Sequence, residues 1–147
     1  KNSDFQLYTF NTEVESSIES TLGQWIPVSD SEQLNQAVEN LSEIVPNGGT
    51  NLEDVFMEVG NLVPRPDNIY LITDGLPTQG SKGTRDLTVT GKKRLKLYNE
   101  ALKQLPEGIP VNIILAPMEG DYMAASAFWR LAQATQGSFM SPSRDWP

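Results

Sequence analysis

Asp74 lies at a position where its carboxylate could take part in chemistry. It directly follows the apolar run of residues 69–73 and precedes Gly75. An aspartate at the end of a buried strand can ligate a hard cation or accept a phosphoryl group. It can equally start an Asp-Gly turn, since aspartate tolerates the turn geometry and glycine supplies a positive φ. The residue types alone leave these interpretations open.

Thr50 is the second candidate, because it follows the pair Gly48-Gly49 at the start of an expected helix. Its hydroxyl oxygen is a hard ligand of the kind that Mg²⁺ prefers. The same hydroxyl can instead cap the helix, because Glu53 lies three residues later, as in a capping box. One hydroxyl does not by itself define a site.

The composition excludes several kinds of enzyme site. The 147 residues include no histidine and no cysteine, which rules out a Ser-His-Asp or Cys-His nucleophile, a thiol redox pair and an ordinary zinc site in this chain. Carboxylate, hydroxyl, lysine and tyrosine chemistry remain. With 38% hydrophobic residues the chain has the size and composition of one globular domain. We assign residues 1–147 to a single domain with a C-terminal tail at 141–147.

The charge is unevenly distributed along the chain. Residues 1–74 carry 13 acidic and 2 basic residues, a net charge of −11, whereas residues 75–147 carry 6 acidic and 9 basic residues, a net charge of +3. Seven of the eleven cations lie between Lys82 and Lys103. This cluster is either a surface for an acidic partner or the solvated face of a helix. The acidic remainder disfavours nucleic-acid binding, because phosphate attraction dominates such affinity.

The hydrophobic pattern alternates between strands and helices. We expect strands at residues 5–10, 23–28, 69–73, 111–116 and 138–140, of which 69–73 is apolar enough to be buried on both faces. Four helices are expected. The first follows N-cap candidates at 29–31 and the second begins at Thr50. The third spans 92–105, and the fourth spans 122–136 with Gly137 as its C-terminal cap. Between them, residues 76–91 are expected to form a long surface loop. The alternation predicts an α/β fold with a Rossmann-like, mostly parallel sheet, helices on both faces, and ligand binding at the carboxyl ends of the strands.

Two motifs in combination resemble those of the von Willebrand factor type A domain. They are Gly48-Gly49-Thr50-Asn51-Leu52 and, 22 residues later, the strand end Ile72-Thr73-Asp74-Gly75. The likeness extends over nearly the whole chain, and its order and spacing carry more weight than either motif. The five expected strands resemble, in order, the second to sixth strands of the family.

The resemblance implies a metal-ion-dependent adhesion site that binds Mg²⁺ through three loops. Thr50 matches the threonine of the family's second loop, Asp74 the aspartate of its third, and Gly75 the glycine that lets the third loop turn. Mg²⁺ prefers hard oxygen ligands and can leave one position for an acidic group of a protein partner. The wider binding surface that we assign comprises Gly48, Gly49, Asn51, Gly75, Lys82 and Arg85.

The family's first loop, Asp-x-Ser-x-Ser, has no match in this chain. We therefore expect a domain incomplete at its N-terminus, lacking the first strand and helix, with only weak Mg²⁺ binding by Thr50 and Asp74. In the family that strand lies between the second and the fourth. Either a missing or separate segment completes the sheet, or strand 5–10 pairs directly with strand 69–73. An open edge with unpaired amides would be costly, so self-association or completion by another segment is expected.

The resemblance favours a non-enzymatic protein–protein interaction module. An alternative is a receiver-like or phosphatase-like domain in which Asp74 takes part in Mg²⁺-dependent phosphoryl transfer, and a structural assembly module is a third. The tail at 141–147, with Phe128-Trp129 before it, also resembles uncharacterised bacterial proteins that carry this domain after a membrane anchor. That likeness implies a membrane-associated parent protein, although no residue of this chain is expected to contact lipid.

Overall fold

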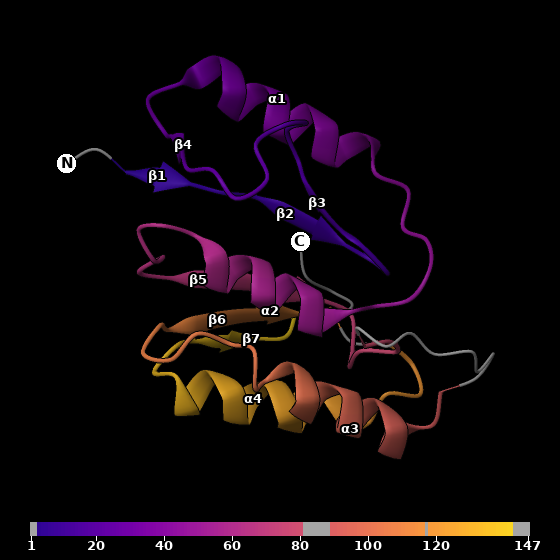
Figure 1. Ribbon diagram of the computed structural model, residues 1–147. Coiled ribbons are helices and arrows are strands. Elements are labelled where there is room, and N and C mark those ends of the chain that lie inside the picture. Colours follow the sequence, from indigo (N-terminus) through magenta and orange to yellow (C-terminus); the bar gives the residue numbers. More distant parts are fainter. Residues whose placement is uncertain (1–2, 81–88, 117, 143–147) are drawn as a thin grey trace.

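The computed structural model of the chain describes residues 3–80, 89–116 and 118–142 (Figure 1). Within them the fold is mixed α/β, with four helices and a three-stranded parallel sheet, compatible with a Rossmann-like class. The strands are β1 (Asp4–Phe5), β2 (Tyr8–Phe10), β3 (Val14–Ser16), β4 (Ile26–Pro27), β5 (Ile69–Thr73), β6 (Val111–Leu115) and β7 (Phe139–Met140). The helices are α1 (Ser31–Glu43), α2 (Leu52–Asn61), α3 (Gly91–Ala101) and α4 (Ala124–Ala134).

The parallel sheet has the order β5-β6-β7, and its main core lies on one face. Leu71 of β5 and Ile113 of β6 are register partners, and both pack into a core that includes Phe56 of α2 and Phe128 of α4. The opposite face is open: Tyr70 is 73% exposed and Ile72 is 66% exposed. The prediction that strand 69–73 is buried on both faces is therefore wrong within the described part of the chain, because no described helix covers this second face.

The N-terminal part forms two short antiparallel pairs, β1 with β4 and β2 with β3. The strand expected at 5–10 is interrupted after Phe5, where the Gln6 side-chain amide donates to the carbonyl oxygens of Thr21 and Gln24. The strand expected at 23–28 is reduced to Ile26–Pro27. Of the mostly parallel sheet that was expected, the described residues show the three parallel strands β5–β7, whereas the N-terminal strands form antiparallel pairs.

Helix α1 begins as predicted but is poorly covered. Its N-cap is Asp30, whose carboxylate accepts from the Gln33 backbone N–H at 3.1 Å. Only Ala37 is buried, with Ile18 and Ile26. The other apolar side chains at helical spacing in this segment are exposed; they are Leu34, Val38, Leu41, Ile44 and Val45.

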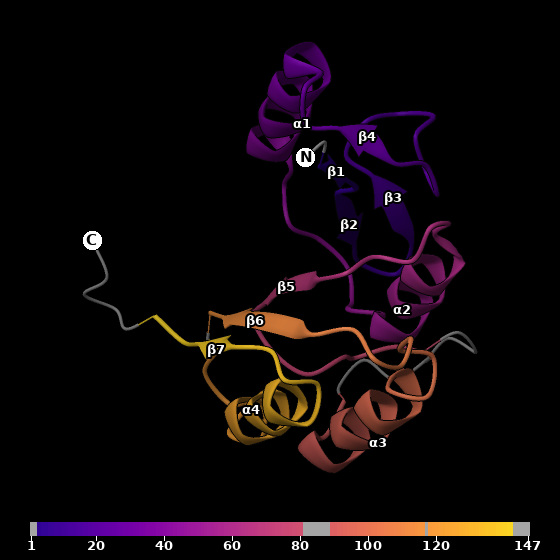
Figure 2. The same cartoon turned by 90° about the vertical axis from the view of Figure 1, so that its left-hand side faces the viewer.

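Figure 2 shows how these parts are arranged. Helices α3 and α4 lie on the far side of the β5–β7 sheet from the N-terminal strands, whereas α1 lies beyond those strands. Helix α2 lies alongside both parts, because it contacts β2 and β3 as well as α3. The N-terminal strands and the parallel sheet therefore face each other without being paired.

Candidate functional site: a groove between two unpaired strand edges

A groove of about 1190 Å³ separates the N-terminal strands from β5. One wall contains all of β2 and the other contains all of β5. Apolar side chains enter from both helical layers, Leu41 and Ile44 from the end of α1, and Val55 and Phe56 from α2. The hypothesis that strand 5–10 pairs directly with strand 69–73 is wrong, because β2 and β5 belong to different sheets and no ladder joins them.

The described charged residues that line the groove are all of one sign. Five acidic residues line it and none of its described lining residues is lysine or arginine; the acids are Asp4, Glu13, Glu15, Asp67 and Asp74. Tyr8 also lines it, and burial raises the pKa of its phenol above the usual value. The phenol is therefore neutral near pH 7, and the fixed charge of the described groove lining is negative.

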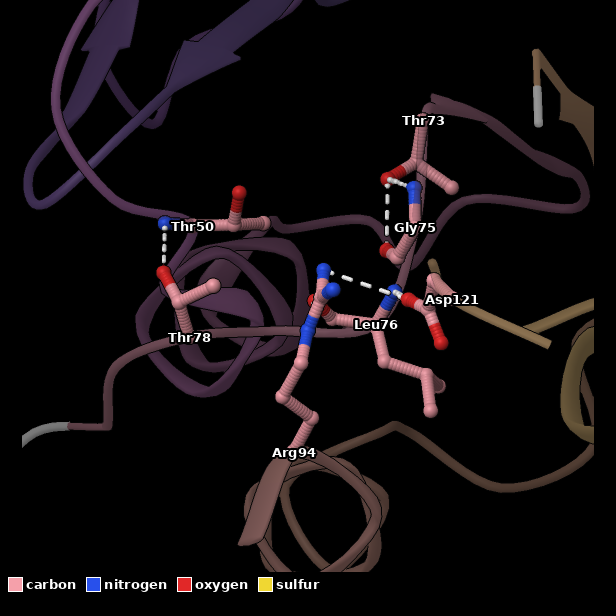
Figure 3. Close-up of polar contacts among 7 residues, drawn as sticks. All are labelled: Thr50, Thr73, Gly75, Leu76, Thr78, Arg94 and Asp121. Carbon is pink, nitrogen blue, oxygen red and sulfur yellow. Dashed lines mark hydrogen bonds and ion pairs between the residues drawn. The ribbon is translucent and has the colours of Figure 1, made fainter. Parts of the chain in front are cut away.

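The loop before α2 ties the carboxyl ends of β2 and β5 together. The Asn51 N–H donates to the carbonyl oxygen of Asn11, directly after β2, at 2.7 Å. The Thr50 carbonyl accepts from the N–H groups of Thr78 and Gln79, which follow β5, at 3.0 Å each. The Thr50 N–H donates to the Thr78 hydroxyl at 2.9 Å (Figure 3). Because both strand ends meet at one loop, β2 and β5 run in the same direction.

This contact explains the conformation of the Gly48-Gly49-Thr50 turn. Gly48 has a φ of +75°, which glycine tolerates best. A Cβ on Gly49 would lie 2.8 Å from the Thr78 hydroxyl and 2.7 Å from the Gln79 amide nitrogen. Gly48 thus suits the backbone conformation of the turn, and a side chain at position 49 would require the Thr78 and Gln79 side chains to shift.

Thr50 and Asp74 both line the groove, Thr50 in the loop before α2 and Asp74 directly after β5. Asp74 is exposed and Thr50 is partly buried. The Thr50 hydroxyl points away from Thr78 (Figure 3), and it does not cap α2. The predicted Thr50–Glu53 capping box is wrong, because the N-cap is Asn51, whose side chain accepts from the Asp54 N–H.

Thr50 and Asp74 would supply only part of the coordination of a magnesium ion. Thr50 offers one neutral oxygen and Asp74 one carboxylate, whereas Mg²⁺ takes octahedral coordination by oxygen ligands and usually keeps several waters. No group of three or more acidic side chains that could hold a metal ion occurs among the described residues. Weak Mg²⁺ binding by Thr50 and Asp74 therefore stays a prediction.

A buried ion pair holds the loop after β5, and the sequence analysis did not identify it. Arg94 of α3 lies 3.2 Å from Asp121, and the Arg94 guanidinium also donates to the Leu76 carbonyl (Figure 3). Asp121 accepts from the Leu76 N–H at 2.7 Å. A Cβ on Gly75 would lie 2.7 Å from the Asp121 carboxylate. The glycine after Asp74 is thus required because the chain passes directly over this carboxylate.

A signal for Arg94 was present in the sequence. Arg94, Tyr98 and Ala101 share one face of α3, and all three are buried. The Tyr98 hydroxyl donates to the Ala127 carbonyl, and its ring packs edge-on against Phe128. Arg94 was counted instead among the cations of a solvated cluster. Two other members of that cluster, Lys82 and Arg85, lie outside the described residues.

No family model, curated protein or solved structure matches the chain. Among the described residues, no helix is both long and apolar enough to cross a membrane.

Proposed function

We propose that this chain is a non-enzymatic protein-interaction module of the von Willebrand factor type A kind, which binds a polypeptide in the groove between β2 and β5. The observation that carries the proposal is the open groove itself, with a free strand edge on each side and apolar side chains above and below. The loops carrying Thr50 and Asp74 form one end of the contact surface. Exposed apolar surface bordered by polar residues is typical of interaction sites.

The family assignment is supported by three features taken together. The Gly48–Asn51 loop meets the loop after β5, as the two motifs require. Strands β5–β7 are parallel. The gap between β2 and β5 corresponds to the place that the family's first strand takes. Magnesium belongs to the proposal only where further oxygen ligands are supplied to Thr50 and Asp74.

A binding role is favoured over phosphoryl transfer by the surroundings of Asp74. Phosphoryl transfer on an aspartate uses a divalent cation that neutralises the transferred group. Such sites usually use further carboxylates at strand ends, and among the described residues no group of three or more acidic side chains could hold the cation.

Selection from a random peptide display library on the immobilised 147-residue chain tests the proposal. We expect enriched peptides whose binding is lost in Leu41→Asp and kept in Leu34→Asp. The two leucines lie on α1 with similar exposure, 40% and 37%, but only Leu41 lines the groove. Failure to enrich any peptide, or equal loss in both variants, would contradict it. A phosphoryl adduct formed with a small phosphodonor and lost in Asp74→Asn would favour the enzymatic alternative.

A further inference from the structure

Asn47 is followed directly by Gly48 in the connection between α1 and α2 (Figure 1). Of the ten asparagines in the sequence, it alone precedes a glycine. The backbone nitrogen after an asparagine lies within reach of the side-chain carbonyl carbon, because the two can close a cyclic imide. Glycine hinders this nitrogen least, since it has no Cβ. The sequence therefore favours an intramolecular reaction at Asn47 over the other asparagines.

The attacking nitrogen is accessible in the folded chain. Gly48 is exposed, and residues 44–50 belong to no helix or strand. Within the described residues the Gly48 N–H donates no hydrogen bond. An amide that is neither buried nor bonded needs no local unfolding before it reacts.

The side chain of Asn47 is held with its carbonyl oxygen on a hydrogen-bond donor. The Asn11 Nδ2 donates to the Asn47 Oδ1 at 3.2 Å, and the Asn47 Nδ2 donates to the Val45 carbonyl at 3.2 Å. Attack on the Asn47 Cγ places negative charge on Oδ1, so the Asn11 donor stabilises the transition state. The bond to Val45 is exposed, and water replaces it at little cost when Nδ2 departs.

We propose that Asn47 is a site of spontaneous deamidation, in which Gly48 supplies the nucleophile and Asn11 the donor to the oxyanion. The Gly48 nitrogen gives its proton to water and forms a bond to the Asn47 Cγ. The Cγ–Nδ2 bond then breaks, and Nδ2 takes a proton from water and leaves as ammonia. Water opens the resulting succinimide at either carbonyl, which gives aspartate or isoaspartate. The reaction needs no partner and is independent of the proposed function.

The pair Asp74-Gly75 has the same ring-forming groups in a different environment. Gly75 is buried, and its N–H donates to the Thr73 hydroxyl at 3.5 Å. A Cβ on Gly75 would lie 2.7 Å from the Asp121 carboxylate, so the backbone is closely packed at this point. The Gly75 nitrogen is therefore protected, and Asp74 should not isomerise although its own side chain is exposed.

Deamidation would change the loop that joins β2 to the loop after β5. Isoaspartate lengthens the main chain by a methylene at residue 47, close in sequence to the Asn51 N–H that donates to the Asn11 carbonyl at 2.7 Å. Either product adds a carboxylate to the lining of the groove, which contains Asn47 and five acidic residues. The isoaspartate form should thus show faster amide exchange at Asn51.

Timed incubation of the 147-residue chain in mildly alkaline buffer, followed by digestion after glutamate and mass spectrometry, tests the proposal. The peptide of residues 44–53 carries both Asn47 and Asn51, so the second asparagine is a control in the same fragment. Asn51 precedes leucine, is 3% exposed and caps α2. We expect the amide-to-acid mass increase at Asn47 and not at Asn51, with separate aspartate and isoaspartate forms. Asn47→Gln should remove the signal.

Two matched variants and a free peptide test the assigned roles. Asn11→Asp keeps the oxygen that accepts from the Glu13 N–H but removes the donor to Asn47, so deamidation should be about threefold to tenfold slower. Asn68→Asp makes the same charge change directly before β5 and should leave the rate unchanged. The folded chain should react within about tenfold of the rate of a synthetic peptide of residues 44–53.

Several results would overturn the inference. A folded chain that reacts more than about tenfold more slowly than the peptide would show that the loop protects Asn47. Equal conversion at Asn51 would show that the exposed Gly48 nitrogen is not the determinant. An unchanged rate in Asn11→Asp would remove the Asn11 donor from the mechanism. Isoaspartate at Asp74, detected as an isomer of unchanged mass, would contradict the protection assigned to a buried and bonded glycine nitrogen.

Discussion

Removal of one charge from the Arg94–Asp121 pair should strongly destabilise the chain. The Arg94 side chain is 10% exposed and that of Asp121 only 1% exposed, so neither charge is well solvated. Both groups also hydrogen-bond the backbone of Leu76. Breaking a buried pair by deleting one partner typically costs about 3–5 kcal/mol, because the other charge is left uncompensated. We expect a loss of this size for Arg94→Met, against a total stability of about 5–15 kcal/mol for a typical domain.

The double variant separates the charge effect from the loss of packing. Arg94→Met combined with Asp121→Leu removes both charges and replaces them with apolar groups, which is often close to neutral. The double variant should therefore be more stable than Arg94→Met alone, although the backbone groups of Leu76 lose their partners. The double variant also keeps the comparison possible if the single variant does not fold.

Urea unfolding followed by circular dichroism measures these differences, provided that the slope with denaturant is unchanged. The exposed pair Lys103–Glu100 provides a control, and Lys103→Met should cost at most about 1 kcal/mol. Amide exchange at Leu76 reports whether the loop itself is released. A cost below about 1 kcal/mol for Arg94→Met, or additive losses in the double variant, would refute the view that this pair fixes the loop after β5.

Three further substitutions test the local geometry, each by the free energy of unfolding. Gln136→Gly should stabilise the folded chain by about 0.5–1 kcal/mol, because Gln136 is exposed and has a φ of +60°, a conformation that glycine adopts without the Cβ penalty. An unchanged free energy of unfolding would contradict this. Gly137→Ala should cost about 3 kcal/mol or more, since its Cβ would lie 2.0 Å from the Val111 carbonyl oxygen, and a tolerated alanine would disprove the close approach. Asn51→Ala should cost about 1–2 kcal/mol through loss of the cap to Asp54, whereas an unchanged midpoint would show that another residue caps α2.

Local sequence signals predicted the features that depend on local interactions. Strand 69–73 is confirmed, and the N-cap Asp30 is one of the three candidates at 29–31, because hydrophobic runs and side-chain caps act within a few residues. The helix start at Thr50 was displaced by one residue. The same spacing of a capping residue and an acidic residue occurs in Thr50–Glu53 and in Asn51–Asp54. We infer that the backbone hydrogen bonds of Thr50 to Thr78, which is remote in sequence, decide between them.

Long-range contacts account for the other errors. Gly137 was predicted as the C-terminal cap of the last helix, but the C-cap is Thr135, Gln136 takes the left-handed conformation and the N–H of Gly137 bonds to Ala132. Glycine is needed at 137 because of Val111, a residue in a different strand. Strand β3 was not predicted, although the side chain of Asn11 accepts from the Glu13 N–H and so forms the turn that precedes it.

The open groove lies beside the exposed apolar face of α1 and the exposed face of β5. Parallel strands are normally buried between helical layers, and here α1 and α2 lie on opposite sides of a position that no described strand fills. The apolar face of α1 is exposed, as are Tyr70 and Ile72 of β5, and no described element covers either. The walls are joined at one end by the Thr50 loop and at the other by the Trp25 indole N–H, which donates to the Pro64 carbonyl at 2.8 Å. These contacts do not depend on a covering element, since they run directly between described residues. Filling the groove should therefore stabilise α1 and β5 together while changing the Thr50 loop little.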